Sequence, residues 1–140
     1  MYGMKKLLTF FSLVVVLSGC VTPVSQMLDN KFLDARLTSP EVAGVWTTAA
    51  GGGLSTIKLN QNGTGVMCED NGHSLNVYQL RNSSNLIYAQ NGMSLKKIVI
   101  NNDVLNVKTT LSAFNVDMKY RADNGLNLAS PRCAKEIKLN

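Results

Sequence analysis

The sequence predicts a mainly β protein, an antiparallel meander of about eight strands that forms a small barrel or sandwich, preceded by a signal-peptide helix and a tether. From Ala43 onward, apolar and polar residues alternate with a period of two, which is typical of strands with one buried face. Turn-forming residues recur about every ten positions, the spacing of hairpins in an antiparallel sheet. The chain of 140 residues suits a single domain of this kind.

The first twenty residues have the organisation of a bacterial signal peptide. Lys5 and Lys6 precede an uncharged apolar run from residue 7 to residue 17. A helix of that length reaches roughly 16 Å at about 1.5 Å per residue, well short of the hydrocarbon core of a bilayer. The run therefore predicts a cleaved leader over residues 1–19 rather than a permanent membrane span.

The leader ends in Leu-Ser-Gly-Cys at residues 17–20, which resembles the bacterial lipobox. The resemblance implies cleavage between Gly19 and Cys20, attachment of a diacylglycerol group to the Cys20 thiol, and acylation of the new amino terminus by a chain such as palmitate. Two or more chains hold a protein stably on a membrane, whereas one does not. The alternative is an ordinary signal peptide, or a short anchor, with an incidental cysteine.

Position 21 bears on the location of such a lipoprotein. In enteric-type sorting, an Asp after the lipidated Cys retains the protein in the inner membrane, and here the residue is Val21. We therefore expect a protein of the bacterial cell envelope, anchored by lipid to the outer membrane and facing the periplasm or exposed on the surface.

Residues 20–40 are expected to form the lipidated cysteine and a tether to the folded domain. Leu28, Phe32, Leu33 and Leu37 are spaced so that they share one face of a short helix from about Ser25 to Leu37. Alternatively, the segment is disordered and its apolar residues touch the membrane or the domain. Pro40 ends the segment, because the residue before a proline avoids the helical conformation.

The β-domain is expected over residues 41–140. The clearest strand is residues 113–121, where Phe114, Val116, Met118 and Tyr120 alternate with polar residues. The expected strands are 44–49, 54–60, 64–69, 74–81, 85–90, 94–101, 104–110, 113–121 and 126–129.

Asn-Gly pairs mark four of the turns, and the first residues of these pairs are Asn62, Asn71, Asn91 and Asn124. This pair tolerates positive φ at both central positions, as a type I′ hairpin turn requires. The three glycines at 51–53 lack the Lys-Ser/Thr of a phosphate-binding loop and predict a hairpin tip.

Three cysteines are an odd number for an exported protein. Lipidation of Cys20 leaves Cys68 and Cys133, which we expect to pair as a disulfide in an oxidising compartment. The bond would fasten the segment around Pro131 to the third strand. Two free buried thiols or a metal site are the alternatives.

The charged residues exclude several functions. Removing Lys5 and Lys6 from fourteen basic residues leaves twelve against nine acidic ones, so the formal charge falls from +5 to +3 in the mature chain. These basic residues are spread along the strands without aromatic clusters, so no nucleic-acid surface is expected. His73 is the only histidine, its neighbours match no zinc motif, and no Gly-x-Ser-x-Gly is present. We therefore expect no enzyme, metal site or cofactor.

Gly44-Val45-Trp46 at the first strand resembles the Gly-x-Trp motif of lipocalin-like barrels, in which the Trp closes the base of the barrel. A core Trp on a first strand is an equally good interpretation. Together with the Gly-Thr-Gly-x-x-Cys of residues 63–68 and the Ser-Pro-x-Cys of residues 130–133, the pattern also resembles short bacterial lipoproteins without an assigned activity.

Two functions follow as hypotheses. The first is a non-enzymatic binding or structural module on the envelope, whose partner is a small apolar ligand or an envelope protein. The second is a periplasmic inhibitor of lysozyme, because residues 68–70, 77–78 and 119–120 resemble parts of that class. The Ser-Gly that precedes the inhibitory tyrosine in that class is replaced here by residues 115–117, Asn-Val-Asp.

Overall fold

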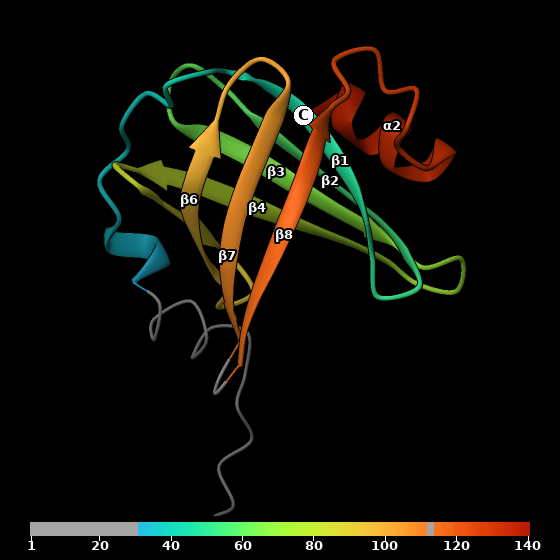
Figure 1. Ribbon diagram of the computed structural model, residues 1–140, viewed down its shortest axis with the longest axis horizontal. Helices are drawn as coiled ribbons and strands as arrows, with labels where there is room; N and C mark the ends of the chain where they lie inside the picture. The colour runs from blue at the N-terminus through green and yellow to red at the C-terminus, as the bar shows by residue number, and fades with distance from the viewer. Residues whose placement is uncertain (1–30, 112–113) are drawn as a thin grey trace, which may run out of the picture.

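The computed structural model describes residues 31–111 and 114–140. The expected leader and the first half of the expected tether, Cys20 included, lie outside the described residues. The described chain forms a closed antiparallel barrel in which each strand pairs with the next and the last pairs with the first, as the sequence predicted (Figure 1). The strands are β1 (Gly44–Ala50), β2 (Gly53–Leu59), β3 (Thr64–Asp70), β4 (Leu75–Ser83), β5 (Leu86–Ala89), β6 (Ser94–Ile100), β7 (Val104–Leu111) and β8 (Phe114–Ala122).

The barrel is filled by the inward residues of alternate positions. On β2 these are Ser55, Ile57 and Leu59, which are 0 to 2% exposed. The largest buried side chains of this core are Trp46 and Tyr120, each 1% exposed. This packing accounts for the alternation seen in the sequence, because side chains of a strand point to opposite faces in turn.

One end of the barrel is closed by the segment that precedes β1. The amide of Asn82 donates to the carbonyl oxygen of Thr38 over 2.8 Å, and the ammonium of Lys97 donates to Asn82 Oδ1 over 2.7 Å. Lys97 also forms an ion pair with Glu41 at 2.8 Å. Phe32 is buried beside this network, with the Arg81 guanidinium 5.6 Å from the centre of its ring. We call this the closed end.

The other end splays open. β1 and β8 are joined by only two register pairs, Trp46 with Ala122 and Thr47 with Arg121. β4 and β5 are joined by four, which leaves Leu75–Gln79 of β4 without a register partner in β5. The strands therefore diverge into two leaves, β1–β4 and β5–β8, and Figure 1 shows β6–β8 running away from β1–β4 at this end.

A C-terminal helix, α2 (Pro131–Leu139), packs on the outer face of the β1–β4 leaf. Its start follows the rules for helix N-termini, since Pro131 occupies the first turn and the Ser130 hydroxyl accepts from the backbone N–H of Cys133 over 3.1 Å. Cys133 and Ile137 face the sheet and contact a small apolar cluster that includes Val45, Val66 and Cys68.

This part of the chain corrects the sequence prediction. The expected ninth strand at 126–129 is a turn and loop, because the carboxylate of Asp123 accepts the backbone N–H groups of Asn127, Leu128 and Ala129. The helix that follows was not predicted. Its nine residues are too few for an amphipathic period to be distinguished from a loop.

The tether and the turns also differ from expectation. Of the helix expected from Ser25 to Leu37, the described part contains one 3-10 turn, Phe32–Asp34, and Leu33 is 52% exposed. No asparagine of the four Asn-Gly pairs has a positive φ, so these turns are not type I′. Their asparagines accept backbone bonds instead, as Asn71 Oδ1 does from the N–H of His73 over 2.9 Å.

The two-residue turn with positive φ at both positions lies elsewhere, at Gly51 (57°) and Gly52 (78°) between β1 and β2. The expected hairpin tip at residues 51–53 is thereby confirmed. Glycine is required there because an L side chain rarely adopts these angles.

Candidate functional site

The splayed end contains a cavity of about 530 Å³. It opens between the ends of β1 and β8, where the two strands have no register pairs. We call this opening the mouth. A volume of this size lies within the range of small-molecule sites, about 300–1,000 Å³. The cavity exists because the leaves diverge here, so that their inward side chains no longer meet across the barrel.

The walls of the cavity are mostly apolar. Met67 and Leu95 form its deeper part and are each 1% exposed, whereas Val116, nearer the mouth, is 46% exposed. The apolar lining residues are Ala49, Ala50, Leu54, Met67, Met93, Leu95, Val116, Met118 and the ring of Tyr120. Methionine side chains are flexible and adapt to ligands of different shape.

Polar side chains also line this cavity, among them Tyr120 and Ser55. The hydroxyl of Tyr120 shares a hydrogen bond of 3.0 Å with the hydroxyl of Ser55. Burial raises the pKa of Tyr120 to about 12, the bond from Ser55 opposes the shift, and the nearby charge of Glu69 adds to it. Tyr120 therefore stays a neutral phenol that can donate or accept inside the cavity.

Glu69 and Thr109 also line the cavity, one from each leaf. Burial raises the pKa of Glu69. Among the described residues, no ion pair or hydrogen bond compensates its carboxylate. Thr109 is 3% exposed, lies on the inward face of β7 with Leu105 and Val107, and its hydroxyl has no hydrogen-bond partner in the described chain.

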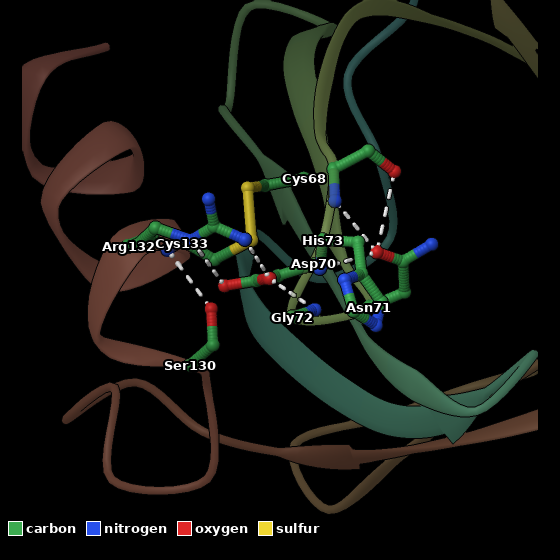
Figure 2. Close-up of polar contacts among 9 residues, drawn as sticks. Cys68, Asp70, Asn71, Gly72, His73, Ser130, Arg132 and Cys133 are labelled. Carbon is green, nitrogen blue, oxygen red and sulfur yellow. Dashed lines mark hydrogen bonds and ion pairs between the residues drawn. A yellow bond between two sulfur atoms is a disulfide. The ribbon is translucent and has the colours of Figure 1, made fainter.

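The rim beside the mouth is fixed by Asp70, at the end of β3 (Figure 2). Its carboxylate accepts two bonds from Arg132 of α2, at 2.5 and 3.1 Å, and a third from the backbone N–H of Gly72 at 2.9 Å. Arg132 first, then the bonds from Gly72 and Ser130, hold the pKa of Asp70 well below its ordinary value. The β3–β4 turn is thereby tied to the C-terminal helix.

The predicted disulfide is present next to this ion pair. Cys68 and Cys133 are bonded, with their Cα atoms 5.5 Å apart, and both are fully buried. The two alternatives, free thiols or a metal site, are therefore wrong. His73 lies exposed on the neighbouring turn, and among the described residues no group of three metal-binding side chains occurs around it or elsewhere.

The residues that resemble a lysozyme inhibitor are spread over the fold. Cys68 is in the disulfide, Glu69 lines the cavity, and Asp70 bonds Arg132. Tyr120 is in the barrel core with its hydroxyl on Ser55, so it does not lie on an exposed loop. Trp46 of the Gly-x-Trp motif is also in the core, and its indole N–H is buried without a partner in the described chain.

The sequence did not identify the cavity residues. Glu69 follows Met67 by two positions on the strand 64–69, so a charged residue at an inward position was a detectable sign. The other cavity groups, Ser55 and Thr109, occur in strands where small polar residues are ordinary, and nothing in the sequence distinguishes them.

Comparison with known proteins identifies one feature, at the amino terminus. Residues 4–20 match the prokaryotic membrane lipoprotein lipid attachment site. No curated protein and no solved structure matches the chain significantly. Within residues 31–111 and 114–140, no helix is both long and apolar enough to cross a bilayer. The chain is thus a membrane-anchored bacterial lipoprotein with a β-barrel domain.

Proposed function

We propose that this lipoprotein is a non-enzymatic binding module that holds a small, mainly apolar molecule in the barrel cavity. The observation that carries the proposal is the cavity itself, about 530 Å³ with methionine and leucine walls and an open mouth. Apolar surface left open to water at this depth is stabilised when a ligand covers it. The resemblance of residues 44–46 to the lipocalin-like motif supports the same function by analogy.

The lipid attachment site supports binding at the cell envelope. We infer that the lipid is attached to Cys20, that cleavage follows Gly19, and that the protein resides on the outer membrane, since Val21 replaces the aspartate of inner-membrane retention. A tethered module of this kind would hold its ligand at the membrane surface, whereas a protein without an anchor would diffuse away with the ligand bound.

Inhibition of lysozyme is less well supported. It needs a tyrosine presented on a loop, whereas Tyr120 is 1% exposed. An assay of lysozyme in the presence of the mature lipoprotein checks this alternative, and we expect no inhibition at micromolar protein.

Binding is testable with the methionine methyl groups as reporters. The mature lipoprotein, in phosphatidylcholine nanodiscs and labelled at methionine methyls, is titrated with octan-1-ol and followed by NMR. We expect saturable shifts at Met67, Met93 and Met118, which line the cavity, and none at Met27, which precedes the described residues.

A matched pair of variants distinguishes the cavity from the surface. Val116→Trp fills the mouth and should abolish the saturable shifts, whereas Val99→Trp alters a valine of similar exposure, 41% against 46%, that does not line the cavity. Absence of saturable shifts in the wild-type protein, or their survival in Val116→Trp, would refute the proposed function.

A further inference from the structure

We propose that the ligand of this cavity carries a cationic head group, an alkyl ammonium or similar amine on an apolar body, which binds the carboxylate of Glu69. The inference rests on the proposed function and names the class of ligand. It is carried by the uncompensated position of Glu69, by an unpartnered hydroxyl in the same cavity, and by the apolar walls around both.

The acidic residues of the cavity lining differ in how they are neutralised. Asp70 is held by Arg132 at 2.5 Å, and Asp117 lies opposite Lys108 in the β7–β8 register. Glu69 has neither arrangement. Its register partners are Ser55 on β2 and Asn76 on β4, which are both uncharged. Glu69 is therefore the one acidic lining residue in the described chain that has neither an ion pair nor a cationic register partner.

Lys119, which also lines the cavity, does not fill this role. Tyr120 and Met118 on either side of it pack against the barrel core, so Lys119 points to the outer face, opposite Asn106. No ion pair joins Lys119 to Glu69. Thus the half-buried Glu69 carboxylate is left without a counter-charge from the described protein.

Partial burial of a charge without a partner costs part of its solvation free energy, and an ammonium group would offset that cost. Burial raises the pKa of Glu69, and a bound cation would reverse that shift by favouring the ionised form. Fatty acids are disfavoured as ligands for the same reason, because a second carboxylate would face the first.

Thr109 gives an independent indication that a polar ligand atom belongs here. A hydroxyl that is 3% exposed normally has a hydrogen-bond partner, yet Thr109 Oγ1 has none in the described chain. Thr109 Oγ1 itself has almost no accessible surface, so it would accept an N–H from an amine only after the side chain turns toward the cavity. The charge of Glu69 and this second group both favour a ligand with a polar head group over a purely apolar one.

The test uses three ligands with the same chain and different heads. The mature lipoprotein in phosphatidylcholine nanodiscs is titrated with octylamine, octan-1-ol and octanoate, and the Kd values are read from the cavity methionine methyls. We expect octylamine to bind about tenfold or more tightly than octan-1-ol, and octanoate to bind most weakly, since a charge-assisted hydrogen bond contributes more than a neutral one.

Two isosteric variants assign the residues. Glu69→Gln should bring octylamine down to the affinity of octan-1-ol, whereas Glu136→Gln, on α2 outside the cavity, should leave the order unchanged. Thr109→Val should lower the affinity for both octylamine and octan-1-ol severalfold, since it removes the hydroxyl without changing the shape of the side chain. Urea unfolding of each variant verifies that it is folded.

The outcomes separate the two proposals. If all three ligands bind with equal affinity, or if Glu69→Gln leaves octylamine binding intact, the cationic class is wrong while the binding function stands. Tightest binding of octanoate also overturns it. If none of the ligands gives saturable shifts, the binding function itself fails.

Discussion

Asp70 illustrates how one side chain fixes the rim of the cavity. Its carboxylate connects the end of β3, the turn at Gly72 and the first turn of α2 through Arg132. Asp123, directly after β8, has a comparable role. Its carboxylate accepts hydrogen bonds from the Thr47 hydroxyl and from three backbone N–H groups. Both carboxylates replace water as partners of backbone groups that no sheet or helix satisfies.

The bonds of Asp70 make stability depend on pH. Because Arg132 and the other donors lower the pKa of Asp70 in the folded state from an ordinary value of 3.8, this stabilisation is fully present above that value. It is lost as the pH falls through the unfolded pKa toward the folded one. We expect Asp70→Asn to be less stable than the wild type at neutral pH, with a difference that shrinks in acid.

Urea unfolding from neutral pH down to about pH 2 measures this difference. Asp103→Asn is the control, since Asp103 is exposed on the β6–β7 turn and bonds through its backbone rather than its carboxylate. A gap between Asp70→Asn and the wild type that stays constant with pH would show that the lost stability is not that of the charged carboxylate.

At the scale of elements, α2 is held by a covalent bond and by a small apolar contact. The Cys68–Cys133 bond closes a loop of 65 residues, and Ile137 is 2% exposed against the outer face of the β1–β4 leaf. Loop closure over that length stabilises the folded state by about 4 kcal/mol in the chain-entropy model.

We therefore expect the double variant Cys68→Ala, Cys133→Ala to lose about 4 kcal/mol of unfolding free energy. Guanidinium unfolding measures this, and wild-type protein unfolded under strong reductant should shift by a similar amount. A loss below about 1 kcal/mol would mean that the unfolded chain is already compact around these residues.

The outer face of the β5–β8 leaf contains an unfavourable pair of lysines on neighbouring strands. Lys96 of β6 lies directly opposite Lys108 of β7, and both are exposed. Like charges at directly opposed positions destabilise a sheet. We expect Lys96→Glu to raise the unfolding free energy by about 0.2–1 kcal/mol, with a gain that shrinks in high salt.

Lys119→Glu is the matched control for Lys96→Glu, because it changes the charge equally while its register partner is the uncharged Asn106. Urea unfolding of the two variants at low and high salt compares them. An equal gain in both would attribute the effect to net charge rather than to the lysine pair.

The elements also show which parts of the fold the sequence determines locally. The strands were predictable because each has one face in a filled core, and a period of two records that burial, as in Ile57 and Leu59. The helix α2 and the loop before it were not, because they depend on bonds to Asp70 and Asp123, which are remote in sequence.

The disulfide was predictable by counting cysteines, which needs no geometry. The cavity was not predictable, since it depends on how many register pairs join β1 to β8 and β4 to β5. A periodic pattern predicts which face of the sheet a side chain lies on, but not the residue at which two strands stop pairing. The sequence indicated that Glu69 is a charged residue at an inward position. It did not indicate that the strands separate there and leave a cavity beside this residue.

For the whole molecule, the two ends of the barrel have separate roles. The segment from Lys31 to Thr38 packs at the closed end, where Thr38 bonds Asn82 and Ser84, whereas the mouth lies at the opposite, splayed end. The described segment before β1 therefore packs at the end of the barrel away from the mouth. We expect the mouth to face away from the anchoring membrane.

Quenching by lipids with a nitroxide head group measures this orientation. A fluorescent amino acid at Asn102, on the β6–β7 turn of the closed end, should be quenched more than one at His73, on the β3–β4 turn beside the mouth. Stronger quenching at His73 would place the mouth against the membrane instead.

The Cys68–Cys133 bond also constrains the order of events during export. The five strands β4–β8 lie between the two cysteines, so their thiols cannot meet until all five have crossed the inner membrane. Until then, the other thiol of the chain within reach of Cys68 is that of Cys20. Transfer of a lipid to Cys20 removes that competitor, so early lipidation would protect the emerging protein from forming the wrong disulfide.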